Sequence, residues 1–175
     1  VSDVHPYHPA IVKGNVTKPP QIVPRRHVIF AIGDNTGLID CAAYEPTGDL
    51  RKAAKQLIVG DAVEVSGGVR PASSKHPLTI NLEKLRVVRL APKIVFQNPL
   101  CPRCGKRLKS MGAKKGFRCE KCGFRSSRLK KVEVEQNRGL EEKLYVTSPR
   151  SQRHLTKPLS RYGMEKRGKF KTMIR

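Results

Sequence analysis

Four of the five cysteines occur in two Cys-x-x-Cys pairs, and these residues are the best suited to chemistry. Cys101 and Cys104 form the first pair, and Cys119 and Cys122 form the second, with fourteen residues between the pairs. A glycine follows each pair and permits the tight turn in which two thiolates converge on one ion. Because four thiolates favour Zn²⁺ in a closed tetrahedral site, the spacing predicts one structural zinc ion in a zinc ribbon.

Other uses of this pattern are weaker hypotheses. An iron–sulfur cluster or a redox dithiol also employs Cys-x-x-Cys, but two pairs at this spacing, each with a glycine behind it, are typical of zinc. The odd number of cysteines argues against a disulfide framework and favours a reducing compartment, so we expect a cytoplasmic location. Cys41 stands apart in a predicted strand, where we expect a small buried apolar residue.

Basic residues surround the two cysteine pairs. Residues 101–131 contain 12 Lys and Arg against Glu120 alone, a net charge of +11. Zinc with four thiolates contributes −2, which leaves about +9. This surplus indicates a polyanionic partner, and nucleic acid is favoured over anionic lipid because no basic amphipathic helix is predicted. The candidate RNA-binding residues here are Arg103, Lys106, Arg107, Lys109, Lys114, Lys115, Arg118 and Arg125.

A second basic segment ends the chain. Residues 143–175 hold 10 Lys and Arg against Glu165, with prolines at 149 and 158. We interpret residues 136–175 as a basic C-terminal arm, with a disordered solubilising tail as the alternative for residues 163–175. The arm's candidate RNA-binding residues are Arg150, Arg153, His154 and Lys157.

The region before the cysteines alternates short apolar runs with turn residues. The pattern predicts strands at 11–16, 28–32, 38–44, 62–69 and 78–90, and a helix at 49–56 capped by Thr47 or Asp49. The prolines at 19, 20 and 24 are expected to end the first strand, and Gly67-Gly68 to form a barrel corner or bulge. Five strands with one helix between the third and fourth are the layout of an OB-fold; another small antiparallel barrel is the alternative.

The predicted fold is therefore mainly β: an OB-fold barrel, then a four-cysteine zinc ribbon and a basic arm. The expected domains are a linker end at 1–10, the OB-fold at 11–96, the ribbon at 97–135 and the arm at 136–175. The longest apolar run has five residues, so no membrane segment is expected. We find no Ser/His/Asp set, phosphate-binding glycine loop or carboxylate pair, and no leader; the initial Val suggests a fragment of a longer protein.

Several segments carry a family resemblance. The OB-like stretch with GDNTGLIDCAAY, followed by NPLCPRCGKRLKSMG, GFRCEKCGF and RSQRHLTKPLSRYG, resembles the C-terminal half of the archaeal tRNA-isoleucine agmatidine synthetases. The resemblance implies a ligase that uses ATP and agmatine to modify the wobble cytidine of CAU-anticodon isoleucine tRNA. It implies catalytic domains upstream of this chain, an inactive fragment here, and a tRNA-holding role for the OB-fold and ribbon.

Two other functions compete with this interpretation. One is an OB-fold and zinc-ribbon protein that binds single-stranded nucleic acid, as a replication or RNA-processing accessory factor. The other is a structural docking module. Aromatic residues make up only 5% of the chain, so binding led by phosphate contacts to a folded RNA is favoured over stacking on unpaired strands.

Overall fold

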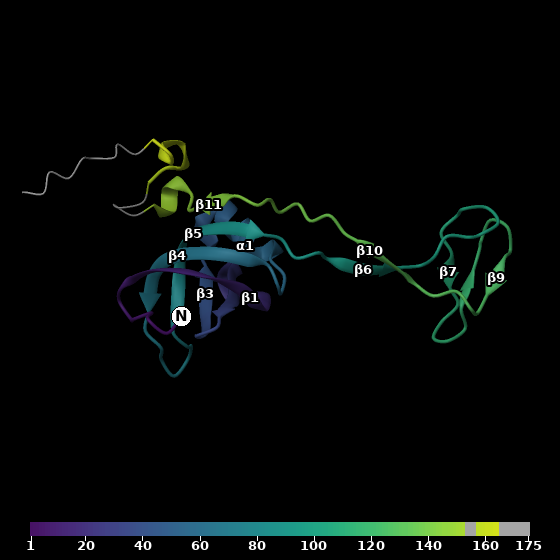
Figure 1. Ribbon diagram of the computed structural model, residues 1–175, viewed down its shortest axis with the longest axis horizontal. Coiled ribbons are helices and arrows are strands. Elements are labelled where there is room, and N and C mark those ends of the chain that lie inside the picture. The colour runs from purple at the N-terminus through teal and green to yellow at the C-terminus, as the bar shows by residue number, and fades with distance from the viewer. Residues whose placement is uncertain (153–156, 165–175) are drawn as a thin grey trace, which may run out of the picture. The chain divides into compact units, whose positions relative to one another are not determined.

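The computed structural model describes residues 1–152 and 157–164 (Figure 1). The chain divides into two compact units. The first comprises residues 1–91 together with the described residues from Gly139 onward, and the second is Pro92–Arg138. The boundaries expected from the sequence were residues 10, 96 and 135.

The first unit is a closed five-stranded barrel with the strand order of an OB-fold. Its strands are β1 (Pro9–Val23), β2 (His27–Asp34), β3 (Gly37–Ala43), β4 (Ala62–Arg70) and β5 (Thr79–Arg89). β1 pairs antiparallel with both β2 and β4, β2 with β3, and β4 with β5, while β3 closes the barrel by pairing parallel with β5. The predicted fold class is thus confirmed, and four of the five strands lie close to their predicted positions.

The first strand differs from its prediction. The sequence suggested a strand of six residues ended by prolines, whereas β1 continues through Pro19 and Pro20 to Val23. The register with β2 shifts between Val16 and Lys18 and again between Lys18 and Gln21. The prolines lie in this irregular stretch, where the missing N–H groups break no regular ladder.

The helix α1 (Asp49–Gln56) has the predicted bounds but a different cap. Gly48 is the N-cap residue, with φ of 65°, and makes no side-chain capping bond. The Thr47 hydroxyl instead donates to the carbonyl of Tyr44 at 2.7 Å, within the 3-10 turn η2 (Glu45–Thr47).

The barrel interior is filled by apolar side chains from every strand and from α1. Phe30, Ile80 and Leu85 are fully buried there, and Cys41 is buried as predicted. Leu140, which follows the second unit in sequence, packs into the same core. Beyond it, β11 (Leu144–Val146) pairs antiparallel with β5, so this part of the predicted arm belongs to the barrel.

The buried carboxylate of Asp61 joins the loop after α1 to the segment that follows β5. Asp61 is fully buried, and its carboxylate accepts the N–H of Ile58 at 2.8 Å and the N–H of Ala91 at 2.7 Å. We expect Asp61→Ala to lower the free energy of unfolding by about 2–3 kcal/mol, because two half-buried N–H donors lose this acceptor. Urea denaturation followed by circular dichroism measures the change. The exposed Asp3→Ala is the control and should stay within about 0.5 kcal/mol of wild type.

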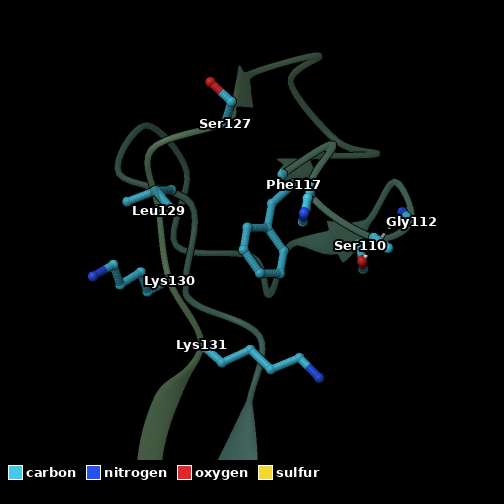
Figure 2. A pocket seen from close by; sticks show the side chains of 10 residues that line it. Ser110, Gly112, Phe117, Ser127, Leu129, Lys130 and Lys131 are labelled. Carbon is cyan, nitrogen blue, oxygen red and sulfur yellow. Dashed lines mark hydrogen bonds between the residues drawn. The ribbon is translucent and has the colours of Figure 1, made fainter.

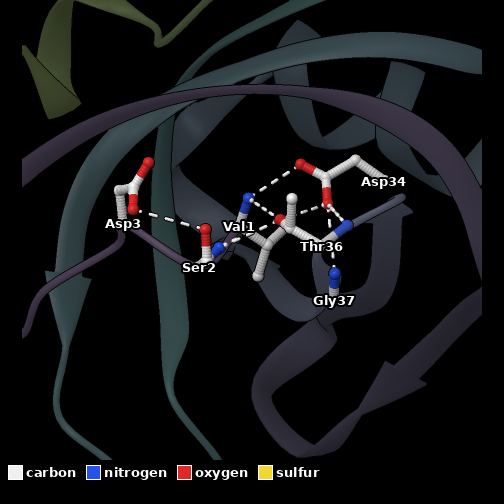
Figure 3. Close-up of polar contacts among 6 residues, drawn as sticks. All are labelled: Val1, Ser2, Asp3, Asp34, Thr36 and Gly37. Carbon is white, nitrogen blue, oxygen red and sulfur yellow. Dashed lines mark hydrogen bonds and ion pairs between the residues drawn. The ribbon is translucent and has the colours of Figure 1, made fainter.

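The β2–β3 hairpin is fixed by a second carboxylate (Figure 3). One oxygen of Asp34 accepts the N–H groups of Thr36 and Gly37 and the Thr36 hydroxyl, while the other accepts the amino group of Val1 at 2.7 Å. Asn35 and Thr36 form the turn between these strands.

The second unit contains two small sheets. β6 (Ile94–Gln97) pairs with β10 (Val132–Glu135), and the three-stranded sheet consists of β7 (Lys109–Ser110), β8 (Phe117–Arg118) and β9 (Arg125–Ser126). Within residues 1–152 and 157–164, no helix has the length and apolar character needed to span a bilayer.

Candidate metal centre and nucleic-acid interface

The four predicted cysteines meet in the second unit. Their Sγ atoms all lie within 4.8 Å of one another, with Cys101 and Cys122 at 3.5 Å and Cys104 and Cys119 at 3.4 Å. A tetrahedral site with Zn–S bonds of ~2.3 Å separates its sulfurs by about 3.8 Å. The cluster therefore fits the ligand set and size of a zinc centre.

The two Cys-x-x-Cys turns repeat one backbone geometry. Gly105 donates its N–H to the carbonyl of Cys101 at 2.9 Å, and Gly123 donates to Cys119 at 3.1 Å. Both glycines have φ near 70°, in the left-handed region that side chains disfavour. Backbone N–H groups, led by that of Cys122, lower the pKa of Cys119 to about 6, whereas burial and the neighbouring cysteine sulfurs raise the pKa of Cys122 to about 11.

The hydrophobic core around the cysteines is small. Leu108 and Phe117 are buried against Cys101 and Cys119, and Phe124 packs beside them half-buried. With so few apolar side chains, we expect this unit to need a metal ion for stability.

A row of cations crosses the three-stranded sheet. The register places Lys109 opposite Arg118, and Arg118 opposite Arg125. Like charges in cross-strand positions destabilise a sheet, so the row indicates a functional requirement. Glu120 offsets one end, with its carboxylate 2.9 Å from the Lys109 ammonium; this hydrogen bond, aided by Lys106 and Arg118, holds the pKa of Glu120 below its usual range.

A basic pocket lies beside the sheet (Figure 2). It has a volume of about 520 Å³, and the side chains of Lys114, Lys130 and Lys131 line it together with the ring of Phe117. Lys114 was a candidate from the sequence, whereas Lys130 and Lys131 were not. Their only signal was the charge of the 101–131 block, because nothing local shows that residues 130–131 return to the 110–117 hairpin.

The remaining candidates have different surroundings. Arg107 donates to the carbonyl of Asn98 at 2.7 Å, and the Arg103 guanidinium lies over Phe124, so each has a structural contact. Lys106 and Lys115 are exposed in the same unit. Arg150 and Lys157 lie in the barrel unit, in the 3-10 turn η3 (Pro149–Ser151) and against Tyr162 respectively. The predicted residues Arg153 and His154 lie outside the described residues.

The fold and the cysteine cluster define an OB-fold and zinc-ribbon protein. Family models agree: an OB-fold nucleic acid binding domain matches residues 11–88, and the TiaS C-terminal zinc ribbon domain matches residues 98–140. The resemblance to the C-terminal part of the 2-agmatinylcytidine synthetases of isoleucine tRNA, TiaS, is confirmed.

Relatives and solved structures give the extent of this similarity. The chain is 50% identical to TiaS of Staphylothermus marinus over 82% of this chain and 32% of that protein. It is 42% identical to TiaS of Methanosarcina acetivorans over 92% of this chain and 36% of that protein. Apo TiaS superposes with a TM-score of 0.75 at 38% identity, covering 93% of this chain and 37% of that one. A complex of TiaS with its isoleucine tRNA and ATP gives 0.70 at 37% identity, covering 91% and 36%. The chain thus spans about a third of its curated relatives.

Proposed function

We propose that this chain is the tRNA-binding part of an ATP-dependent ligase that joins agmatine to the wobble cytidine of CAU-anticodon isoleucine tRNA. The cation row and the basic pocket of the Pro92–Arg138 unit are the observation that carries the proposal. Solved relatives named as TiaS complexes with isoleucine tRNA, ATP and agmatine support it. In this proposal, ATP and agmatine bind catalytic domains upstream in the same polypeptide, and the chain alone performs no chemistry.

The proposed zinc ion has a structural role. Cys101, Cys104, Cys119 and Cys122 would supply all four ligands of a closed site, which leaves no position for a reacting water. The ion would hold the three-stranded sheet and hence the spacing of its cations. A four-thiolate centre is typical of a reducing compartment, which supports a cytoplasmic location.

The pocket lysines provide the test of the RNA interface. We expect the triple variant Lys114→Gln, Lys130→Gln, Lys131→Gln to bind tRNA with a log–log salt slope lower by about 2–3, because each lost phosphate contact contributes roughly one unit. Lys109 and Arg107 are poorer choices, since both have protein partners. Fluorescence anisotropy titrations from about 50 to 300 mM salt, a range chosen around physiological ionic strength, measure the slope.

A matched control distinguishes a specific contact at the pocket from a general effect of lost positive charge. The variant Lys18→Gln, Lys55→Gln, Lys75→Gln removes the same charge from exposed positions of the barrel unit and should lower the slope by less than about 1. Equal losses in both triple variants would contradict a specific contact at the pocket.

A competition experiment distinguishes tRNA from unpaired nucleic acid. Labelled CAU-anticodon isoleucine tRNA is challenged with another tRNA and with single-stranded DNA of equal charge, at ~150 mM salt. We expect both tRNAs to compete well and the DNA poorly. Equal competition by the DNA would replace this proposal with a general single-strand binder.

A further inference from the structure

We propose that the barrel has a groove for one unpaired nucleotide, formed by the start of β1, residues 66–68 of β4 and residues 83–84 of β5. This inference rests on the proposed RNA-binding function and adds a site outside the basic zinc-ribbon unit. The groove has a volume of about 660 Å³, and its lining includes Tyr7, Ile11, Gly67, Gly68 and Lys84. None of these residues was a candidate from sequence, where residues 1–10 were interpreted as a linker end.

Tyr7 presents an aromatic ring at the edge of this groove. Its side chain is 84% exposed, and its φ of 67° is rare for a bulky residue. The backbone is nevertheless fixed, because Tyr7 donates its N–H to the carbonyl of Val69 at 2.9 Å and Val69 donates to the carbonyl of His8 at 3.0 Å. A strained, anchored backbone that exposes a ring to solvent is characteristic of a binding residue. An exposed ring of this kind suits base stacking.

The groove floor is suited to a flat apolar ligand. Ile11 is 73% exposed beside Tyr7, and the groove surface is predominantly apolar. A Cβ at Gly68 would meet no heavy atom within 4 Å, so β4 leaves open space at this position. A nucleobase, which has two apolar faces and a polar edge, matches such a surface.

The other wall of the groove is formed by β5, which contributes Glu83 and Lys84. The Lys84 ammonium lies 5.4 Å from the ring centroid of Tyr162, and the Lys157 ammonium lies 4.5 Å from the same centroid. Burial, together with the charges of Arg161 and Lys84, lowers the pKa of Lys157. Lys157 and Tyr162 are thus neighbours of Lys84 behind the groove wall, and Lys84 is the lysine of the groove lining.

Lys84 offers a donor for a phosphate group, which would accept a charge-assisted hydrogen bond from its ammonium. The groove thus combines an exposed aromatic ring, an apolar floor and a cation, the features that a base and its phosphate require.

The test uses the whole chain and a short single-stranded RNA containing 2-aminopurine, whose fluorescence reports base stacking. The chain contains no Trp, so protein background is low. We expect binding to quench the probe, Tyr7→Ala to weaken binding about tenfold or more, and Tyr7→Phe to bind like wild type, because the ring and not the hydroxyl stacks. Lys84→Gln should lower the salt slope by about 0.7, the value for one phosphate of a single strand.

Two matched variants complete the design. Phe96→Ala removes another exposed ring, from β6, and Lys75→Gln removes another exposed lysine; both should bind the probe like wild type. Undiminished probe binding by Tyr7→Ala, or no quenching with wild type, would overturn the groove.

The test of the groove can fail independently of the test of the proposed tRNA-binding function. The Lys114, Lys130, Lys131 triple variant should still quench the probe, because those lysines belong to the other unit. Loss of the groove signal with intact tRNA binding refutes only the groove. Failure of the tRNA competition with intact quenching refutes only the tRNA assignment.

Discussion

The purified chain is expected to contain one zinc ion, and removing it with a chelator is expected to unfold the Pro92–Arg138 unit while the barrel stays folded. The core of that unit consists of the cysteines and a few apolar side chains, chiefly Leu108 and Phe117. A structural zinc ion contributes ~10–16 kcal/mol to folding, more than such a core supplies. Metal analysis measures the zinc, and hydrogen exchange measured separately over residues 92–138 and over the barrel locates the unfolding.

Two cysteine variants provide the control for this experiment. Cys119→Ser removes one thiolate and should abolish both bound zinc and protection of the ribbon amides. Cys41→Ala changes a buried cysteine of the barrel and should leave zinc content at one ion. Iron absorption, a metal-free folded ribbon, or loss of barrel protection on chelation would each contradict the prediction.

Gly67→Ala is expected to lower the free energy of barrel unfolding by more than about 3 kcal/mol. A Cβ at this position would clash with the carbonyl oxygen of Asn81, a backbone atom that cannot move without opening the sheet. The register of β4 and β5 shifts between Ser66 and Gly67, which is the bulge that the Gly-Gly pair predicted. Urea denaturation monitored by circular dichroism gives the loss.

The neighbouring glycine is a stringent control. A Cβ at Gly68 would meet no heavy atom within 4 Å. Gly68→Ala should therefore be neutral or stabilise the barrel by roughly 0.5 kcal/mol, since alanine is less flexible when unfolded. Similar losses in the two variants would show that the close approach at Gly67 is not the cause.

The barrel was predictable because burial and local turns determine most of it. The alternation of Val63 and Val65 with polar neighbours predicted β4, and a run of good helix formers predicted α1. The first strand was predicted too short, because prolines end strands only where the ladder needs their N–H. That need depends on the register with β2, which no local pattern in β1 reveals.

The candidate sites were likewise predictable only where local sequence determines the position of their residues. The four cysteines were identified by spacing alone, because a Cys-x-x-Cys turn brings two ligands of one ion together within four residues. Lys130 and Lys131 were missed because their approach to Phe117 depends on the path of the chain after β9. Tyr7 was missed because a residue between prolines and histidines has the composition of a linker, and only its hydrogen bonds with Val69 distinguish it.

The pairing of β11 with β5 has a consequence for biosynthesis. One edge of β5 pairs with β4 along its length. On the other edge, residues 79–81 pair with β3 and residues 84–86 pair with β11. That neighbour follows the whole second unit in sequence, so the nascent barrel leaves the ribosome with an unpaired edge. Exposed edges recruit strands from other chains. Because translation proceeds at ~5–20 residues per second, the edge stays open for several seconds while residues 90–146 are made. Rapid metal capture by the ribbon does not close it; only the arrival of β11 ends the interval in which this barrel is prone to aggregate.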